Sequence, residues 1–317
     1  MIARRALPLL VGTPLGAGLA QEQPLRIIIP FPPGGPADTI ARLMEPRLRA
    51  ALGQTLVLDH RSGAGGVVGM EAVARARPDG YTIGLGSTGA LVIAPHLMAR
   101  MPYDPLRDLA PVGEVLAAPQ LLVVPAGSEA RDVAGLVALA RARPGALSYA
   151  SAGIGSSLHL AAELFRQRAG IDITHVPYRG AAPAIIDVVA GRVQLMLGDV
   201  SGLLPQVRGG ALRALAITSV ARFAALPEVP TMAEAGVAGV VSDTFYGFFA
   251  PAGVAPERMA ALSGAVLGAL ADAELRSALE ALGGRIIAST PEAFAVRLRE
   301  SSAGWAEVVR QGGIRAE

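Results

Sequence analysis

Three loops of small and hydroxyl-bearing residues are the part of the sequence best suited to chemistry. They cover residues 32–38 (PPGGPAD), 86–89 (GSTG) and 151–157 (SAGIGSS). Glycine lets a backbone come close to a ligand, and free N–H groups at a helix start favour a negative charge. Turns between strands and helices also need Gly and Ser for structural reasons, but three such loops in one chain favour a ligand cleft. The chemistry they indicate is capture of a carboxylate or similar anion by backbone amides and hydroxyl groups.

Signatures of catalysis are missing from the sequence. All 28 basic residues are Arg, and the chain has no Lys and no Cys, which excludes Schiff-base lysines, Walker A lysines and thiolate chemistry. Neither G-x-S-x-G nor H-E-x-x-H occurs, and the four histidines lack metal-ligand spacing. The pattern Gly84-x-Gly86-x-x-Gly89 formally matches a dinucleotide fingerprint, but Gly84 falls inside a predicted strand. We therefore expect no enzyme, no metal, no cofactor, and no nucleophile beside a base.

The first 20 residues have the layout of a secretory signal peptide. Arg4 and Arg5 precede an apolar run over residues 6–19, and small residues near Ala20 suit cleavage. This run is shorter than the roughly 20 apolar residues that span a bilayer, so we expect no membrane insertion of the mature chain. No Cys follows that could carry a lipid anchor. Removing the segment subtracts two Arg and no acid, so the net charge falls from +2 to 0 and gives no support to nucleic-acid binding.

The loops must be positioned by strands and helices, and short apolar runs do alternate with helical patterns along the chain. The predicted strands cover residues 25–31, 55–58, 81–85, 121–124, 147–150, 173–176, 193–197, 212–218 and 245–250. The predicted helices cover residues 38–52, 67–75, 132–143, 156–169, 183–190, 256–270, 273–282 and 291–311. This alternation predicts an α/β protein with two mostly parallel, doubly wound sheets, whose ligands bind at the carboxyl ends of the strands.

Seven ordered motifs resemble the Bug/TctC family, the periplasmic solute-binding receptors of tripartite tricarboxylate transporters. They include LRIIIPFPPGGPADTIAR at residues 25–42 and YASAGIGSSLHLAAELFRQRAG at residues 149–170. The other five cover residues 59–86, 175–191, 212–219, 226–236 and 246–253. The resemblance extends over essentially the whole chain after the signal peptide.

The resemblance implies a type II periplasmic binding protein fold, in which two doubly wound lobes joined by two crossover strands close on a small carboxylate. The crossover strands would be residues 121–125 and 245–251. Lobe 1 would then be discontinuous, with residues 22–123 and 245–317, and lobe 2 would contain residues 124–244.

The resemblance also implies which residues bind ligand. Matching positions in lobe 1 are Phe31, Gly34, Gly35, Ala37, Asp38, Ser87 and Thr88. Matching positions in lobe 2 are Ser151, Gly155, Ser156, Tyr178, Gly180, Ala184 and Asp199. Residues 198–199 depart from the family, which frequently has Asp-Asn there, and an Asp199 carboxylate would accept hydrogen bonds or repel a second carboxylate according to its protonation. Arg179 would supply charge at the cleft rim or remain a solvated surface residue.

The function implied is a monomeric, non-catalytic receptor in the periplasm. It would trap a small organic carboxylate by lobe closure and deliver it to the small and large membrane subunits of a tripartite tricarboxylate transporter. One alternative is a sensory protein that presents its ligand to a membrane histidine kinase. Another is an exported enzyme, against which the absent catalytic motifs argue.

Overall fold

Ten strands form one hydrogen-bonded sheet in a computed structural model that describes residues 23–312 and residue 314. The strand order is β2-β1-β3-β9-β4-β7-β5-β6, and β8 and β10 each pair with β4. The predicted signal peptide lies outside the described residues. Within them, no helix is both long and apolar enough to cross a membrane.

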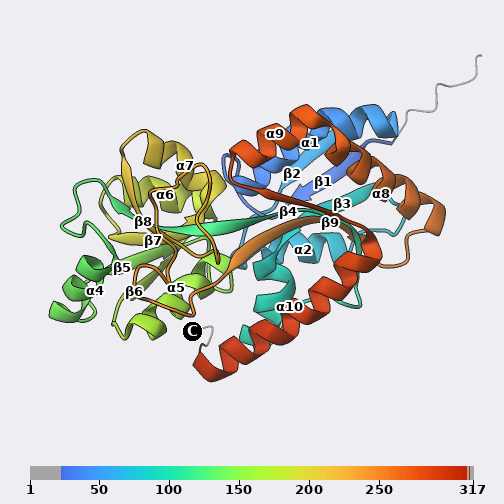
Figure 1. Cartoon of the computed structure of the whole chain (residues 1–317). Coiled ribbons are helices and arrows are strands. Elements are labelled where there is room, and N and C mark those ends of the chain that lie inside the picture. Colours follow the sequence, from blue (N-terminus) through green and yellow to red (C-terminus); the bar gives the residue numbers. More distant parts are fainter. Residues whose placement is uncertain (1–22, 313, 315–317) are drawn as a thin grey trace, which may run out of the picture.

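The strand β4 (Leu109–Pro125) belongs to both halves of the sheet (Figure 1). Residues 109–119 pair with β9, whereas residues 120–125 pair with β7 and β8. The first half contains β1 (Leu25–Ile29), β2 (Leu56–His60), β3 (Thr82–Ser87), β9 (Asp243–Pro251), β10 (Arg285–Ser289) and the first part of β4. The second half contains β5 (Ser148–Ser151), β6 (Thr174–Pro177), β7 (Leu195–Asp199), β8 (Leu212–Ile217) and the end of β4.

Helices cover both faces of each half (Figure 1). Those around the first half are α1 (Pro36–Leu52), α2 (Val67–Ala74), α3 (Ala94–Leu97), α8 (Pro256–Ala271), α9 (Ala273–Ala281) and α10 (Pro291–Gly312). Short helical turns η1 (Ala64–Gly66) and η2 (Gly89–Ile93) lie with them. Those around the second half are α4 (Val133–Ala142), α5 (Ser157–Ala169), α6 (Ala181–Val189) and α7 (Val200–Arg208). The C-terminal helices therefore return to the first half, where they share its apolar core.

The expectation of two mostly parallel sheets was only partly right. The strands β2, β1 and β3 are parallel to one another, as are β7, β5 and β6, but every pairing that joins these groups through β4 and β9 is antiparallel. The first part of β4, β10 and α7 were not predicted. Pro111 and Pro119 interrupt the strand pattern of β4, and Pro205 interrupts the helical pattern of α7. Pro111 is tolerated because the register of β4 against β9 shifts directly after it.

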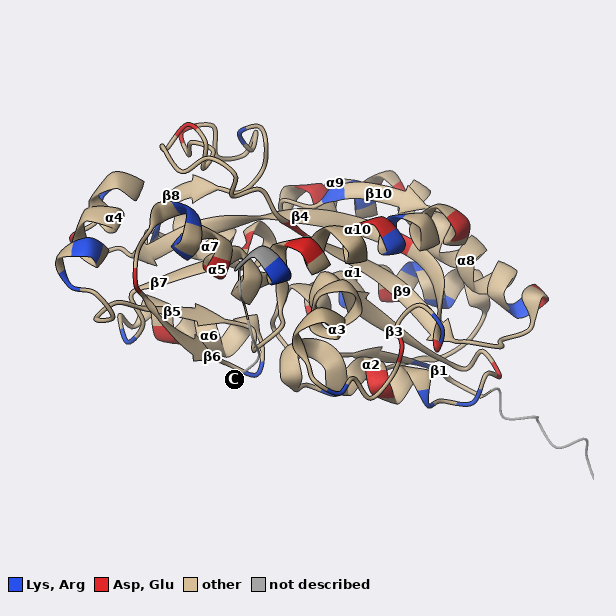
Figure 2. Ribbon diagram, turned by 90° about the horizontal axis from the view of Figure 1, so that it is seen from below, with Lys and Arg blue, Asp and Glu red and all other residues tan. Residues whose placement is uncertain are grey.

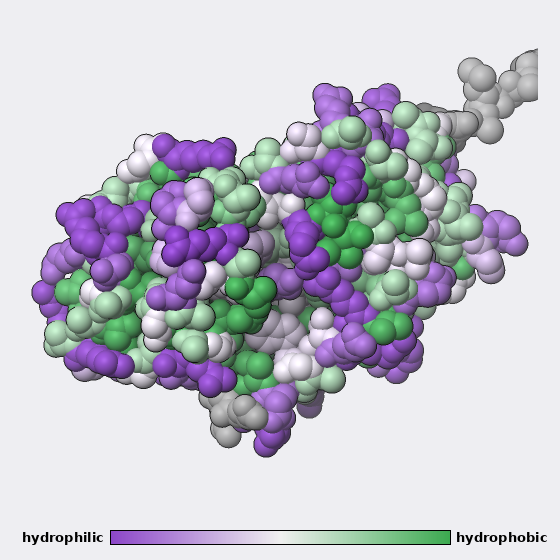
Figure 3. Space-filling model, in the orientation of Figure 1, coloured by the Kyte–Doolittle hydropathy of each residue, from purple (hydrophilic) through white to green (hydrophobic). Residues whose placement is uncertain are grey.

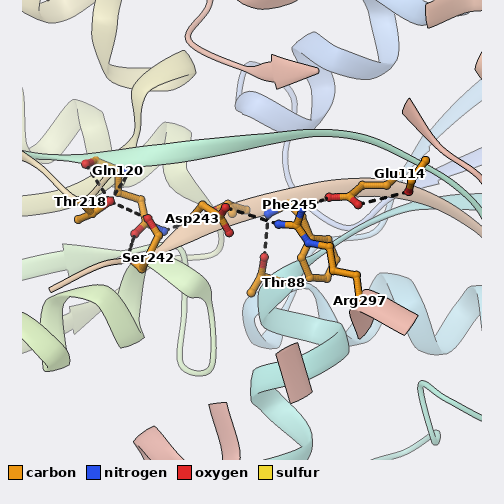
Figure 4. Close-up of polar contacts among 10 residues, drawn as sticks. Thr88, Glu114, Gln120, Thr218, Ser242, Asp243, Phe245 and Arg297 are labelled. Carbon is orange, nitrogen blue, oxygen red and sulfur yellow. Dashed lines mark hydrogen bonds and ion pairs between the residues drawn. The ribbon is translucent and has the colours of Figure 1, made fainter. Parts of the chain in front are cut away.

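Arg297 of α10 holds the two central strands together (Figure 4). Its guanidinium lies 2.9 Å from Oε1 of Glu114 on β4 and 3.5 Å from Oδ2 of Asp243 on β9. Glu114 is fully buried, and burial raises the pKa of its carboxyl to about 7 against the opposing effect of Arg297. Because Oε1 has no aligned hydrogen bond, the charge of Arg297 is its main compensation.

We predict that Arg297→Met destabilises the protein by about 3 kcal/mol at pH 8, because it leaves an ionised carboxylate buried without a partner. The loss should be smaller at pH 6, where Glu114 is protonated. Urea unfolding at both pH values measures it, with Arg299→Met, an exposed position of the same helix, as the control. Equal losses at the two pH values would contradict this role.

Candidate functional site

A small cavity of about 20 Å³ lies where the two halves of the sheet meet. Its lining comes from the loop between β1 and α1, the end of β3, the loop between β5 and α5, the start of α6, the end of β7 and the start of β9. The lining residues are Phe31, Pro32, Gly35, Pro36, Ala37, Ser87, Ala152, Ser156, Ser157, Leu158, Ala181, Asp199, Thr244 and Tyr246. None is Arg or His, so an anion here would find no cationic side chain in the lining.

Four helices begin at this cavity. The lining includes the first residues of α1, α5 and α6 and the residue before α7. The backbone N–H groups of a first helical turn have no acceptor within the helix, and the helix dipole makes that end partly positive. Two of these helices, α1 and α5, have 17 and 13 residues. The convergence of their starts supplies a positive field without side-chain charge.

Helix α1 starts two residues earlier than the sequence suggested. Its N-cap is Gly35, because Pro36 fits the first helical position, where no N–H is needed. This brings Pro36 and Ala37 to the cavity. Helix α5 begins as expected after Ser156, whose hydroxyl accepts a hydrogen bond from the N–H of His159 at 3.2 Å.

Asp199 is the one carboxylate in the lining, and it is almost fully buried. Its two oxygens accept hydrogen bonds from the hydroxyls of Thr244 at 2.6 Å and Tyr246 at 2.5 Å. Burial raises the pKa of Asp199 to about 6, since it outweighs these hydrogen bonds, which favour the ionised form. Thr244 also contacts Ser157 Oγ at 2.7 Å and Nε2 of Gln120 on β4 at 3.1 Å. The carboxylate is therefore tied to both central strands.

Glycines let the two halves touch around the cavity. A Cβ added to Gly89, in the first half, would lie 2.8 Å from Cα of Ser156 in the second. A Cβ added to Gly180, in the second half, would lie 2.5 Å from Cδ of Pro32 in the first. Real Cβ atoms do not approach so closely, so these contacts depend on glycine. Since the enclosed space holds little more than one water molecule, the halves must separate before an organic solute can enter.

The structure brings six of the sequence-predicted ligand residues together around the cavity. They are Phe31, Gly35, Ala37, Ser87, Ser156 and Asp199. The remaining eight lie in the same loops and elements but make other contacts.

Asp38 uses both of its carboxylate oxygens in hydrogen bonds that hold the loop between β1 and α1. Its carboxylate accepts hydrogen bonds from the N–H of Gly34 at 2.9 Å and from Nε of Arg42 at 3.0 Å, and its Oδ1 lies 2.7 Å from Nε2 of His60. Burial alone would raise the pKa of Asp38, but the hydrogen bonds outweigh it and hold the pKa below the usual 3.8. Asp38 and Gly34 therefore shape the loop that presents Gly35 and Ala37.

Four further predicted residues have structural contacts. Thr88 Oγ1 accepts a hydrogen bond from the N–H of Phe245 at 2.8 Å, which joins β3 to β9 (Figure 4). Tyr178 donates to Asp187 at 2.7 Å. Ala184 is fully buried in the core beneath α6, and Gly180 packs against Pro32. Arg179 is exposed and does not line the cavity.

Ser151 and Gly155 contact a stacked pair of histidines, of which His159 is buried and His175 is partly buried. Ser151 Oγ lies 2.7 Å from Nε2 of His175, and the N–H of Gly155 donates to Nδ1 of His159 at 3.3 Å. The two imidazoles stack at 4.2 Å, and burial lowers the pKa of both, that of His175 to about 3. The expectation that no nucleophile lies beside a base was thus wrong for Ser151. However, Ser151 is fully buried, so its hydroxyl is not exposed to solvent in this structure.

Thr244 and Tyr246 are site residues that sequence reasoning missed. The motif at residues 246–253 and the predicted strand at residues 245–250 drew attention to β9, but neither residue was among the predicted ligand-binding positions. Side chains alternate along a strand, so the two neighbours of Phe245 both face the opposite way, toward the cavity. The alternation of side chains along β9 could be read from the sequence. The contact with Asp199 could not, because Asp199 lies 45 residues from Thr244 in the chain.

A family model and related proteins both match this chain over most of its length. The family model described as "Tripartite tricarboxylate transporter family receptor" matches residues 40–314. A UPF0065 protein from the tcbD-tcbE intergenic region of Pseudomonas sp. strain P51 is 41% identical over 296 residues, which are 93% of this chain and 88% of the relative. Protein BugT of Bordetella pertussis is 36% identical over 306 residues, 96% of this chain and 94% of the relative.

Solved structures confirm the predicted two-lobe α/β class. The periplasmic binding protein BugD matches with a TM-score of 0.90 and 31% identity, covering 93% of this chain and 99% of that one. A Rhodopseudomonas palustris protein solved with adipate matches at 0.89 and 34% identity, covering 92% and 98%. MatC from the same species, with bound malate, matches at 0.87 and 31% identity, covering 90% and 98%.

Proposed function

The chain belongs to the tripartite tricarboxylate transporter receptor family, as its sequence motifs indicated, and we propose that it captures a small organic carboxylate between the two halves of its sheet. Members of this family are periplasmic solute receptors. The observation that carries the carboxylate proposal is the convergence of four helix starts on one cavity between the halves. Adipate and malate in two related structures support the same ligand class.

The proposed cycle is closure of two lobes on the solute followed by delivery to the two membrane subunits of a tripartite transporter. We propose as lobes residues 22–123 with 245–317, and residues 124–244. Strand partners change between Pro119 and Gln120, which supports a hinge there. The solute would stabilise the closed arrangement by its higher affinity for it. We further propose that the receptor is exported by a signal peptide cleaved near Ala20 and acts as a non-catalytic monomer.

Thermal unfolding of the refolded, purified protein tests the ligand class. Malate, adipate, citrate, benzoate and aspartate are compared with glucose and choline, each over a concentration series. A carboxylate at 100 times its Kd should stabilise the folded state by about 2.7 kcal/mol and raise Tm accordingly. A rise with glucose or choline and with no carboxylate would overturn the proposal.

The pH dependence of the affinity for the solute should report the ionisation of Asp199. For a dicarboxylate, Kd should rise by up to about 20-fold between pH 5.5 and pH 7.5, because Asp199 ionises near pH 6 and then repels the ligand. Asp199→Asn should remove this dependence in isothermal titration. For an amino acid the sign reverses, since its ammonium group pairs with the ionised carboxylate. A wild-type Kd that does not change with pH would show that Asp199 does not face the solute.

Closure should depend on Gly89. We predict that Gly89→Ala weakens solute binding about tenfold or more, because its methyl group meets the backbone of Ser156 only when the halves touch. The φ of Gly89 is not positive, so alanine fits its local backbone. Gly264→Ala on α8, where a Cβ meets no atom within 4 Å, is the matched control. Unchanged affinity in Gly89→Ala would argue against closure at this contact.

A further inference from the structure

A larger groove, of about 710 Å³, lies between the halves on the face opposite the cavity. Figure 3 shows the surface hollowed in the middle of this face. Its second-half wall is formed by residues 218–223 after β8 and by Val241 before β9. Its first-half wall is formed by the start of β10 and one face of α10, including Gly304 and Trp305.

The strands β4 and β9 form the floor of this groove, and the cavity lies on the opposite face of the same two strands. Thr244 on β9 lines the cavity, whereas its neighbour Asp243 lines the groove. On β4, Gln120 reaches Thr244, whereas its neighbour Pro119 lines the groove. Because successive side chains of a strand face opposite ways, groove and cavity lie back to back across the crossing strands.

This arrangement couples the two spaces mechanically. Rotation of the halves about β4 and β9 that closes the cavity must draw the walls of the groove apart, and the reverse rotation must bring them together. In this structure the cavity is nearly closed, whereas the groove encloses about 710 Å³, and its two walls meet at one end, where Gly283 packs against Val200 and Phe223. A molecule that fills the groove therefore opposes opening of the cavity.

The groove has the chemistry of a site for an amphipathic anion. Leu164, Phe223, Trp305 and Val308 give it an apolar wall, and its volume is that of a small-molecule site. Arg285 at its edge is exposed and forms no ion pair within 4.0 Å among the residues that the structure describes, and its charge acts more weakly on the buried carboxyl of Glu114. The lining carboxylate, Asp243, already faces Arg297 at 3.5 Å. An aliphatic chain with one terminal carboxylate can pack against the apolar side chains and form an ion pair with Arg285.

We propose that this groove is a second, regulatory binding site for an amphipathic monocarboxylate, whose occupancy holds the halves closed and raises the affinity of the cavity for its solute. Coupling between two sites is reciprocal, so solute in the cavity must also strengthen binding in the groove.

Trp305 provides a direct assay, because it is the only tryptophan of the chain and lies in the groove. Decanoate is the probe, and decanol is the uncharged control. Decanoate should change the emission of Trp305 saturably, and decanol should bind at least tenfold more weakly. No saturable change with decanoate would overturn the site, whatever the outcome for the cavity.

Two variants locate the probe. Arg285→Gln should weaken decanoate binding about tenfold and leave solute affinity without decanoate unchanged, with Arg299→Gln as control. Gly304→Phe should abolish decanoate binding, since its side chain enters the groove at a point where a Cβ meets no atom within 4 Å. Gly268→Phe, at an equally open glycine of α8, is the control. Undiminished decanoate binding in both groove variants would overturn the site.

The regulatory role is tested separately, with the carboxylate that gives the largest Tm rise as solute. Saturating decanoate should lower the solute Kd in wild type at least threefold and should leave it unchanged in Gly304→Phe. Decanoate binding at the groove with an unchanged or higher solute Kd in wild type would overturn the regulatory role while leaving both binding sites intact.

Discussion

The buried polar network at the strand crossing is the constraint on which the rest of this structure depends. At Gln120, strand β4 leaves β9 and joins β7 and β8. Gln120 is fully buried, and its side-chain amide donates to Thr244. The amide also accepts from Ser242 at 2.5 Å, and the backbone N–H of Gln120 donates to Thr218 at 2.9 Å (Figure 4). An unpaired amide at this depth would cost about 1–3 kcal/mol, so the crossing geometry is strongly specified.

The network also connects the proposed hinge to the candidate site. Asp199 is held by Thr244 and Tyr246 of β9, and Thr244 is held by Gln120 of β4. Moving one half relative to the other therefore changes the surroundings of the one carboxylate in the cavity. Most charged residues lie elsewhere, on the helices and outer loops (Figure 2). The cavity itself is left to backbone dipoles and hydroxyl groups.

The sequence was sufficient for local structure and for the family, and insufficient for long-range pairing. The loop after β1 and the N-cap Ser156 follow from local rules that involve only neighbouring residues. The first part of β4 does not follow from local rules. Pro111 suits a strand only because a bulge follows it, and Glu114 is tolerated inside the protein only because Arg297 pairs with it. The contacts of Ser151 with His175 and of Asp199 with Tyr246 join residues 24 and 47 positions apart. No local pattern encodes these pairings, although β-strand alternation was enough to suggest that Thr244 and Tyr246 share a face.

For the proposed anionic solute, a cavity with no cationic side chain in its lining must obtain affinity from the exclusion of water. The partial charges at helix starts are weak in contact with solvent and become strong only at low dielectric. Such a dielectric exists here only when Gly89 meets Ser156 and Gly180 meets Pro32. Binding and closure are then one event, because the open cleft has little affinity and the closed cleft has no entrance. The carboxylate of Asp199 contributes to the same dependence on closure. Loss of water strengthens the attraction of the helix dipoles for an anion, and it also strengthens the repulsion between that anion and an ionised Asp199. Under the proposed function, selectivity consequently depends on the protonation of the buried Asp199 side chain rather than on a pattern of basic residues.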